Sequence, residues 1–266
     1  MINKRTKRIT ILCGHYGSGK TSVAVSYAIA LARGGPPGAA APTDVVRISA
    51  YPVGDDPLGV PPLVGTDGNP PEFVGGASFP SGSHVALVDL DIVNPYFRAH
   101  DALQRLKAAG IRFIGSQFAN SNLDVPALPQ ELYSIIDDRS SRFVLDVGGD
   151  DRGALALGRL SGAIKAENDY EMLAVINCYR PLTRTPADAL AVMREIETAS
   201  GIKFTGIVNN SNLGGQTSAQ TVLDSIEYAH EVSRLSGLSI VFTSVKAELC
   251  DALSVQIPNV FPLIFA

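Results

Sequence analysis

The chain of 266 residues is long enough for one large α/β domain, and 45% hydrophobic against 18% charged residues allow a substantial core. A net charge of -4 and a pI near 5.6 give no sign of a nucleic-acid-binding surface. The three cysteines lie far apart without a C-x-x-C pair, which excludes a sequence-local zinc or iron–sulfur motif and indicates the reducing environment of the cytoplasm.

A short basic cluster precedes the first predicted strand and consists of Lys4, Arg5, Lys7 and Arg8. We interpret it as a solvated N-terminal arm, because short charge runs more often face solvent than form a binding patch. No apolar segment of the signal-peptide kind follows it. No apolar run approaches the length needed to span a bilayer, so we expect no transmembrane helix.

The first predicted strand, about Arg8–Cys13, leads directly into a glycine-rich stretch, Gly14-His15-Tyr16-Gly17-Ser18-Gly19-Lys20-Thr21. This stretch reads G-x-x-x-x-G-K-[ST], and the alanine-rich segment after it, Ser22 to Arg33, is predicted to be a helix. Strand, glycine loop and helix in this order form a phosphate-binding loop (P-loop), in which backbone N–H groups and the helix N-terminus face phosphate oxygens. Lys20 is expected to reach the β- and γ-phosphates, and the Thr21 hydroxyl to ligate Mg²⁺. The predicted nucleotide-binding residues here are Gly14, Gly17, Ser18, Gly19, Lys20, Thr21 and Ser22.

The next 50 residues, 34–83, interrupt the alternation of strands and helices. They contain 10 prolines and 10 glycines and few apolar clusters. Such a composition buries too little apolar surface to offset its ordering entropy. We therefore treat 1–266 as a single nucleotide-binding domain in which 34–83 is an inserted surface loop, and we expect this loop to be disordered.

Six further apolar segments are predicted to be strands: about Val85–Leu90, Arg112–Ile114, Phe143–Val147, Met172–Asn177, Lys203–Val208 and Leu238–Thr243. Helical patterns lie between most of them. Three of these patterns carry start or stop signals. Asn94-Pro95 begins the first and Gly110 ends it, and Thr185 begins the second and Gly201 ends it. The third pattern covers 217–236 and is followed by Gly237. Continuous apolar strands alternating with helices predict a three-layer, doubly wound, mostly parallel α/β sheet of seven strands.

Two of these strands end in acids, where a P-loop protein needs groups that hold Mg²⁺ and position water. The second strand ends in Asp89-Leu90-Asp91, and the fourth contains Asp146, followed by Gly149 in a D-x-x-G pattern. In this pattern Asp146 would contact Mg²⁺ through water, and the Gly149 amide would sense the γ-phosphate as a switch.

The segments GHYGSGKT, VDLDIVNPYFR and LDVGGDD together resemble the MinD/ParA/Mrp-type P-loop ATPases, relatives of the CobQ/CobB synthetases and the nitrogenase iron protein. The resemblance covers nearly the whole chain apart from the insertion, and it implies a fold that binds ATP with Mg²⁺ and usually hydrolyses it. Carried over by position, Asp89 would lie near the Mg²⁺ shell, Asp91 would orient the attacking water, and Asp146 would be the Walker B acid. Asn210 falls where relatives have an asparagine that reads the adenine edge, with Asn209 as a close second.

The sequence departs from this family in three respects. Relatives with a signature lysine carry it at the position of His15, so a nucleotide-sandwich homodimer is left open. The cysteines that hold the iron–sulfur cluster in nitrogenase-type relatives are missing. The last residues, 256–266, contain two prolines and no lysine or arginine. They are therefore expected to form a strand-like segment packed on the domain rather than a membrane anchor.

We expect a Mg²⁺-dependent ATPase that binds ATP and ADP and couples hydrolysis to an unidentified protein partner, such as a maturation or metallocofactor system. Two alternatives stay open: a small-molecule kinase or ATP-dependent ligase on the same fold, and a binding switch with negligible turnover. Adenine is expected over guanine, because Asn209-Asn210-Ser211-Asn212 stands where a guanine-specific N-K-x-D pattern would be.

Overall fold

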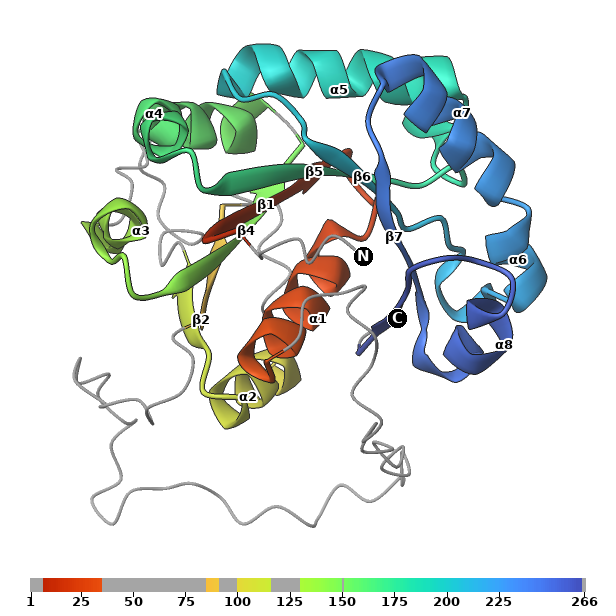
Figure 1. Ribbon diagram of the computed structural model, residues 1–266, viewed down its shortest axis with the longest axis horizontal. Helices are drawn as coiled ribbons and strands as arrows, with labels where there is room; N and C mark the ends of the chain where they lie inside the picture. Colours follow the sequence, from red (N-terminus) through yellow and green to blue (C-terminus); the bar gives the residue numbers. More distant parts are fainter. Residues whose placement is uncertain (1–6, 35–84, 91–99, 116–129, 150, 265–266) are drawn as a thin grey trace.

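The computed structural model describes residues 7–34, 85–90, 100–115, 130–149 and 151–264, and the predicted inserted loop lies almost wholly outside them. Within this part an eight-stranded sheet has the order β3-β2-β4-β1-β5-β6-β7-β8, and every neighbouring pair is parallel (Figure 1). The strands are β1 Ile9–Gly14, β2 Val85–Asp89, β3 Arg112–Gly115, β4 Arg142–Gly148, β5 Tyr170–Ile176, β6 Gly206–Asn209, β7 Ile240–Lys246 and β8 Val260–Leu263. The predicted fold class is confirmed. The sheet has one strand more than predicted, because the C-terminal segment pairs with β7 as β8.

Helices cover both faces of the sheet. They are α1 Lys20–Ala32, α2 His100–Ala108, α3 Ser134–Asp137, α4 Asp151–Glu167, α5 Pro186–Ser200, α6 Ala219–Leu223, α7 Ile226–Ser236 and α8 Cys250–Ser254. Helices α4, α5 and α7 lie on one face, and α1 and α2 on the other (Figure 1). No helix in the described part of the chain is long and apolar enough to cross a membrane.

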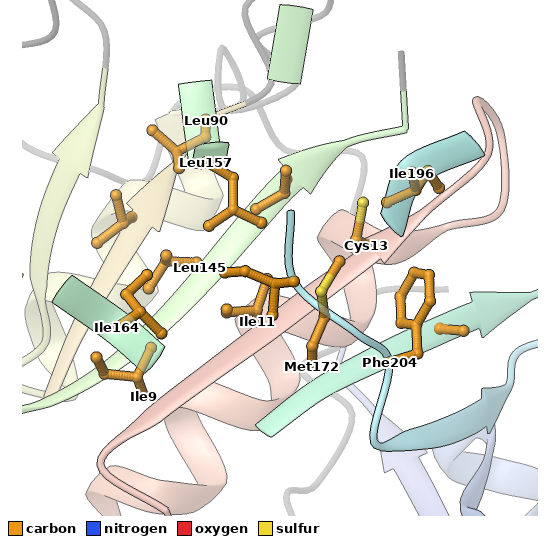
Figure 2. Packing of buried hydrophobic residues seen from close by; sticks show 14 of the residues in the cluster. Ile9, Ile11, Cys13, Leu90, Leu145, Leu157, Ile164, Met172, Ile196 and Phe204 are labelled. Carbon is orange, nitrogen blue, oxygen red and sulfur yellow. The ribbon is translucent and has the colours of Figure 1, made fainter. Parts of the chain in front are cut away.

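Strand β1 lies at the centre of the sheet and is buried on both sides. Ile9 and Ile11 pack into one apolar cluster with side chains of α4 and α5, while Leu12 packs into the other with side chains of α1. Figure 2 shows the first cluster around Ile11, with Leu157 of α4 and Ile196 of α5. Because successive strand residues point to opposite faces, a strand between two helix layers needs apolar residues throughout. The P-loop therefore extends from a central strand that is buried on both faces.

Of the predicted helix boundaries, one set is confirmed and one predicted helix is divided in two. The capping box of Thr185 with Asp188 and the left-handed Gly201 confirm the start and stop of α5. The single helix predicted over 217–236 is wrong, because the chain breaks into α6 and α7. The break lies at Ser225. Its buried hydroxyl donates to the Val222 carbonyl at 2.7 Å, so a side chain competes for a backbone acceptor of the helix. The predicted start at Asn94 and Pro95 lies outside the described residues.

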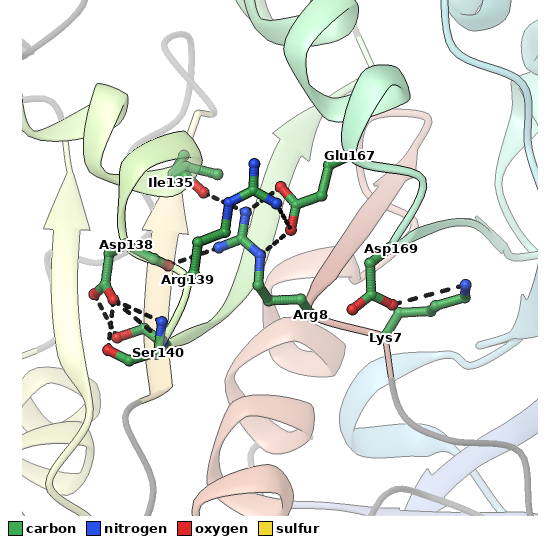
Figure 3. A network of polar contacts seen from close by, with 9 residues as sticks. Lys7, Arg8, Ile135, Asp138, Arg139, Ser140, Glu167 and Asp169 are labelled. Carbon is green, nitrogen blue, oxygen red and sulfur yellow. Dashed lines mark hydrogen bonds and ion pairs between the residues drawn. The ribbon is translucent and has the colours of Figure 1, made fainter.

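The interpretation of the basic cluster as a solvated arm is wrong for Arg8. Its side chain is buried and forms an ion pair with Glu167 at the end of α4 (Figure 3). It also donates hydrogen bonds to the carbonyl oxygens of Ile135, at 2.7 Å, and Asp138, at 2.8 Å. A buried guanidinium requires such a set of acceptors. Arg8 thus ties α3 and α4 to the amino end of β1, at the opposite end of that strand from the P-loop.

Candidate nucleotide-binding site

The loop between β1 and α1 has the conformation of a phosphate cradle. Gly17 and Gly19 have positive φ angles of 76° and 80°, which residues with side chains rarely adopt. The Ser18 amide turns back to the His15 carbonyl with a hydrogen bond of 3.0 Å. Helix α1 begins immediately afterwards at Lys20, so its first N–H groups and its positive dipole end face the loop. This arrangement favours an anion with several oxygens.

The first residue of the loop, Gly14, is closely packed between the ends of β4 and β5. A side chain at Gly14 would place its Cβ 2.3 Å from the Val175 carbonyl oxygen of β5. A side chain at Gly149, after β4, would place its Cβ 2.1 Å from the Gly14 carbonyl oxygen. Gly149 is therefore packed directly on the first residue of the loop. A displacement of Gly149 would therefore displace Gly14 and the loop that follows it.

The strand order brings the predicted acids beside the loop. In the sheet Asp146 of β4 is level with Leu12 of β1 on one side and with Asp89 of β2 on the other. Both carboxylates are buried. The Thr21 hydroxyl donates a hydrogen bond of 2.6 Å to Asp146 Oδ2. The structure thus joins Thr21 to Asp146 by a hydrogen bond and places Asp89 next to Asp146 in the sheet, whereas Asp91 lies outside the described residues.

The oxygen atoms of Thr21 and Asp146 are the kind that Mg²⁺ prefers. Within the described ranges, no group of three or more His, Cys, Asp or Glu side chains could hold a metal ion by itself. This fits Mg²⁺, which is usually held by one or two protein oxygens together with phosphate oxygens and water. The donor set therefore suits Mg²⁺ bound with a nucleotide.

A cavity of about 330 Å³ opens beside the loop. One side consists of the loop and the first turn of α1: Tyr16, Gly17, Gly19, Lys20, Thr21 and Ser22. The rest of the lining comes mainly from residues after β5 and β6 and from the last part of β7: Arg180, Asn210, Asn212, Gly214, Ser244 and Lys246. No acidic side chain is among the lining residues in the described part of the chain. The cavity combines cations and amides, as a polyanionic ligand requires.

Asn210 joins β6 to the P-loop. Its Nδ2 donates to the Ser18 carbonyl at 2.7 Å, and its Oδ1 accepts from the Ser244 hydroxyl of β7 at 2.7 Å. A Cβ at Gly19 would lie 2.4 Å from Asn210 Nδ2, so this contact also requires glycine in the loop. One N–H and one lone pair of the amide still have capacity for a ligand.

Asn209 lies differently from Asn210. Its side chain is fully buried, donates to Ser225 Oγ at 3.0 Å and accepts from the Ser211 amide at 3.2 Å. It is not among the residues that line the cavity. Of the two asparagines named from the sequence, the structure places Asn210 in the cavity wall.

Arg180, Ser244 and Lys246 are among the cavity residues to which the sequence assigned no role. They lie after β5 or near the end of β7, at the carboxyl edge of the sheet, which is the general position of ligand sites in such folds. That position was the available signal. Cys178 lies in the same loop as Arg180, and burial raises the pKa of its thiol, which does not favour an activated cysteine.

No protein-family model and no curated protein matches this chain. Among solved structures it is similar to chloroplast FtsY from Physcomitrella patens, with 14% identity and a TM-score of 0.47 over 92% of this chain and 60% of that one. It is similar to FlhF complexed with GTP and Mg²⁺, with 10% identity and a TM-score of 0.44 over 90% and 66%. It is also similar to the signal recognition particle receptor FtsY from Elizabethkingia anophelis, with 12% identity and a TM-score of 0.44 over 95% and 62%.

This chain thus spans about three fifths to two thirds of the length of these structures. The likeness concerns the fold alone. The α/β class assigned here rests on the topology of this chain's own sheet.

Proposed function

We propose that this protein binds ATP with Mg²⁺, hydrolyses it, and couples hydrolysis to a protein partner, in the manner of the MinD/ParA-type P-loop ATPases. The observation that carries the proposal is the hydrogen bond between Thr21 and Asp146, formed beside a glycine loop that opens into a cavity. A phosphate cradle alone would fit many anions. A cradle with a hydroxyl and a carboxylate meeting at its edge fits a metal-bound nucleoside triphosphate.

The loop residues bind and orient the triphosphate. The amides of Gly17, Gly19 and Thr21 would donate to phosphate oxygens, and the buried Lys20 would place its ammonium group against the β- and γ-phosphates. Thr21 and Asp146 would hold Mg²⁺, directly and through water, with Asp89 near its shell. The bound ion would neutralise charge that develops on the phosphates.

Hydrolysis requires a group that orients water, and we propose Asp91 for this task, two residues after Asp89. A partner would sense the state of the nucleotide through Gly149. The amide of Gly149 would bond to the γ-phosphate, and its packing on Gly14 would transmit loss of that phosphate to α4, which begins at Asp151.

We propose adenine rather than guanine as the base. Guanine presents an N1–H and an N2 amino group, both donors, and is usually read by a carboxylate. The cavity lining has no acid in the described part of the chain. The remaining N–H and lone pair of Asn210 can pair with the adenine ring nitrogen and amino group.

The test is calorimetric titration of the full chain with ATP, ADP and GTP, each with Mg²⁺, followed by phosphate release measured with ATP. We expect binding of ATP and ADP, weaker binding of GTP, and slow phosphate release that a cell extract containing the partner accelerates. Binding without phosphate release, with or without extract, would leave a nucleotide switch and contradict the proposed ATPase.

A further inference from the structure

Arg180 extends from the loop between β5 and α5, and its backbone is firmly held. The Arg180 amide donates to the Asn177 carbonyl, and the Arg180 carbonyl accepts from the Thr183 amide at 3.1 Å. The buried Thr183 hydroxyl returns to the same Asn177 carbonyl at 2.8 Å. These bonds close a short turn directly after the strand next to β1. The turn therefore fixes the position of the Arg180 backbone, from which the side chain extends.

The Arg180 side chain lies across the P-loop at Gly17. A Cβ built on Gly17 would lie 3.5 Å from Arg180 Nε, 3.6 Å from Cδ and 3.9 Å from Cζ. These are ordinary van der Waals distances, so the Arg180 side chain lies directly beside the loop at Gly17. Arg180 also lines the same cavity as Lys20 and Thr21. The two cationic side chains thus approach one space from different elements.

The guanidinium group of Arg180 has donors that the described residues do not use. Its Nε is buried and has no hydrogen-bond partner among them. A buried, unpaired N–H costs free energy, because it has lost its water without gaining another acceptor. Arginine carries five N–H donors in a planar fork that matches phosphate oxygens. A phosphate group in the cavity would supply the acceptors.

We infer that Arg180 binds the phosphate chain of the nucleotide held by its own P-loop. It approaches from the β5 side, across Gly17, and supplies in the same chain a second cation beside Lys20. The position in the loop where related ATPases have a second lysine is His15 here, whose Nδ1 lies 2.9 Å from the Tyr16 carbonyl. This inference rests on the proposed function, since it requires that the cavity hold a nucleotide.

The opposing explanation is that Arg180 supports the loop by packing alone. The two roles differ in their dependence on charge. Methionine keeps an unbranched stem against Gly17 but has no donor, whereas lysine keeps a cation without the planar fork. Arg184 lies four residues further on, is exposed, and does not line the cavity, so Arg184→Met is the matched control.

The experiment compares the wild-type protein with Arg180→Met, Arg180→Lys and Arg184→Met. Affinities are measured by calorimetry for ATP, ADP and inorganic tripolyphosphate, all with Mg²⁺, and thermal unfolding is recorded without ligand. Arg180→Met should weaken binding of ATP and tripolyphosphate by about tenfold to a hundredfold, the loss of one charge-assisted contact. Arg180→Lys should fall between it and the wild type. Arg184→Met should bind as the wild type does, and no variant should unfold earlier.

Unchanged affinity in Arg180→Met would overturn the inference. So would a loss that comes with a lower unfolding temperature and that lysine does not restore, because packing would then be the cause. Tripolyphosphate separates this inference from the proposed function. If the wild type binds tripolyphosphate but neither prefers nor hydrolyses ATP, the proposed ATPase fails while the Arg180 comparison still decides the inference. If the wild type binds no phosphate ligand, both fail.

Discussion

The Thr21 hydroxyl, at the start of α1, donates a hydrogen bond of 2.6 Å to Asp146 Oδ2, at the end of β4. These residues are 125 positions apart in the chain, and the order β4-β1 in the sheet brings them together. The bond joins the phosphate cradle to the carboxylate that would bind the metal ion. It therefore defines the edge at which Mg²⁺ and the terminal phosphate would meet.

Asp146→Asn tests the role of this carboxylate, because it keeps the shape and removes the charge. With Mg²⁺ present, ATP affinity and phosphate release should fall by roughly tenfold to a hundredfold, the usual effect of losing a group that orients a metal's ligands. With EDTA the two proteins should bind ATP equally weakly. Asp224→Asn, at an exposed carboxylate between α6 and α7, is the control. An equal loss in Mg²⁺ and in EDTA would contradict the metal role.

Gly149→Ala tests the packing of Gly149 on the first residue of the loop, Gly14. Its Cβ would lie 2.1 Å from the Gly14 carbonyl oxygen, so one of the two backbones must move. We expect a loss of about 1–3 kcal/mol in the free energy of unfolding, together with weaker ATP binding. Gly162→Ala, in α4, meets nothing within 4 Å and should instead stabilise the protein by about 0.5–1 kcal/mol. Denaturant unfolding of both variants measures these changes in stability. A Gly149→Ala protein with the stability and ATP affinity of the wild type would contradict the close packing.

Asn210→Ala tests the connection between β6 and the P-loop. The change removes the bond to the Ser18 carbonyl and leaves the buried Ser244 hydroxyl without this acceptor. The free energy of unfolding should fall by about 1–3 kcal/mol, and the preference for ATP over GTP should shrink. A double-mutant cycle with Ser244→Ala should show coupling between the two positions. Additive effects would mean that the pair does not act as a unit.

Arg8→Met tests stability away from the site. Removing Arg8 leaves the Glu167 carboxylate buried beside Arg139 alone, whose side chain is largely exposed. We expect a loss of about 3–5 kcal/mol in the free energy of unfolding and an unchanged ATP affinity of the folded protein. Lys7→Met removes the half-exposed pair with Asp169 and should cost less than about 1 kcal/mol. Similar losses in both variants would contradict the buried role of Arg8.

The sequence was sufficient to predict most of the sheet and the phosphate loop. Strand β1 is apolar at nearly every position because helices cover both of its faces, and such runs can be read without knowing their neighbours. The motif from Gly14 to Thr21 is local, so spacing alone reveals it. Asp89 and Asp146 could be placed beside it because parallel strands end at one edge of the sheet.

The errors arose where a residue's partner is distant in sequence. Arg8 reads as part of a basic arm because its acceptor, Glu167, is 159 positions away. The break at Ser225 depends on a hydrogen bond from Asn209, which helical periodicity does not show. The position of Arg180 beside Gly17 follows from the turn after β5 and from the pairing of β5 with β1. The residues next to Arg180 in the sequence reveal neither of these determinants.

The central claim is that the P-loop binds and hydrolyses ATP, and Lys20→Ala tests it most directly. In the proposed function Lys20 contacts the phosphates both in the bound state and during hydrolysis, so affinity and turnover should both depend on it. The measurement is Mg²⁺-ATP affinity by calorimetry and phosphate release in parallel, for the wild type, Lys20→Ala and the surface control Lys203→Ala. We predict that Lys20→Ala loses about tenfold to a hundredfold in affinity and nearly all phosphate release, while Lys203→Ala matches the wild type. Wild-type binding and turnover in Lys20→Ala would contradict the claim.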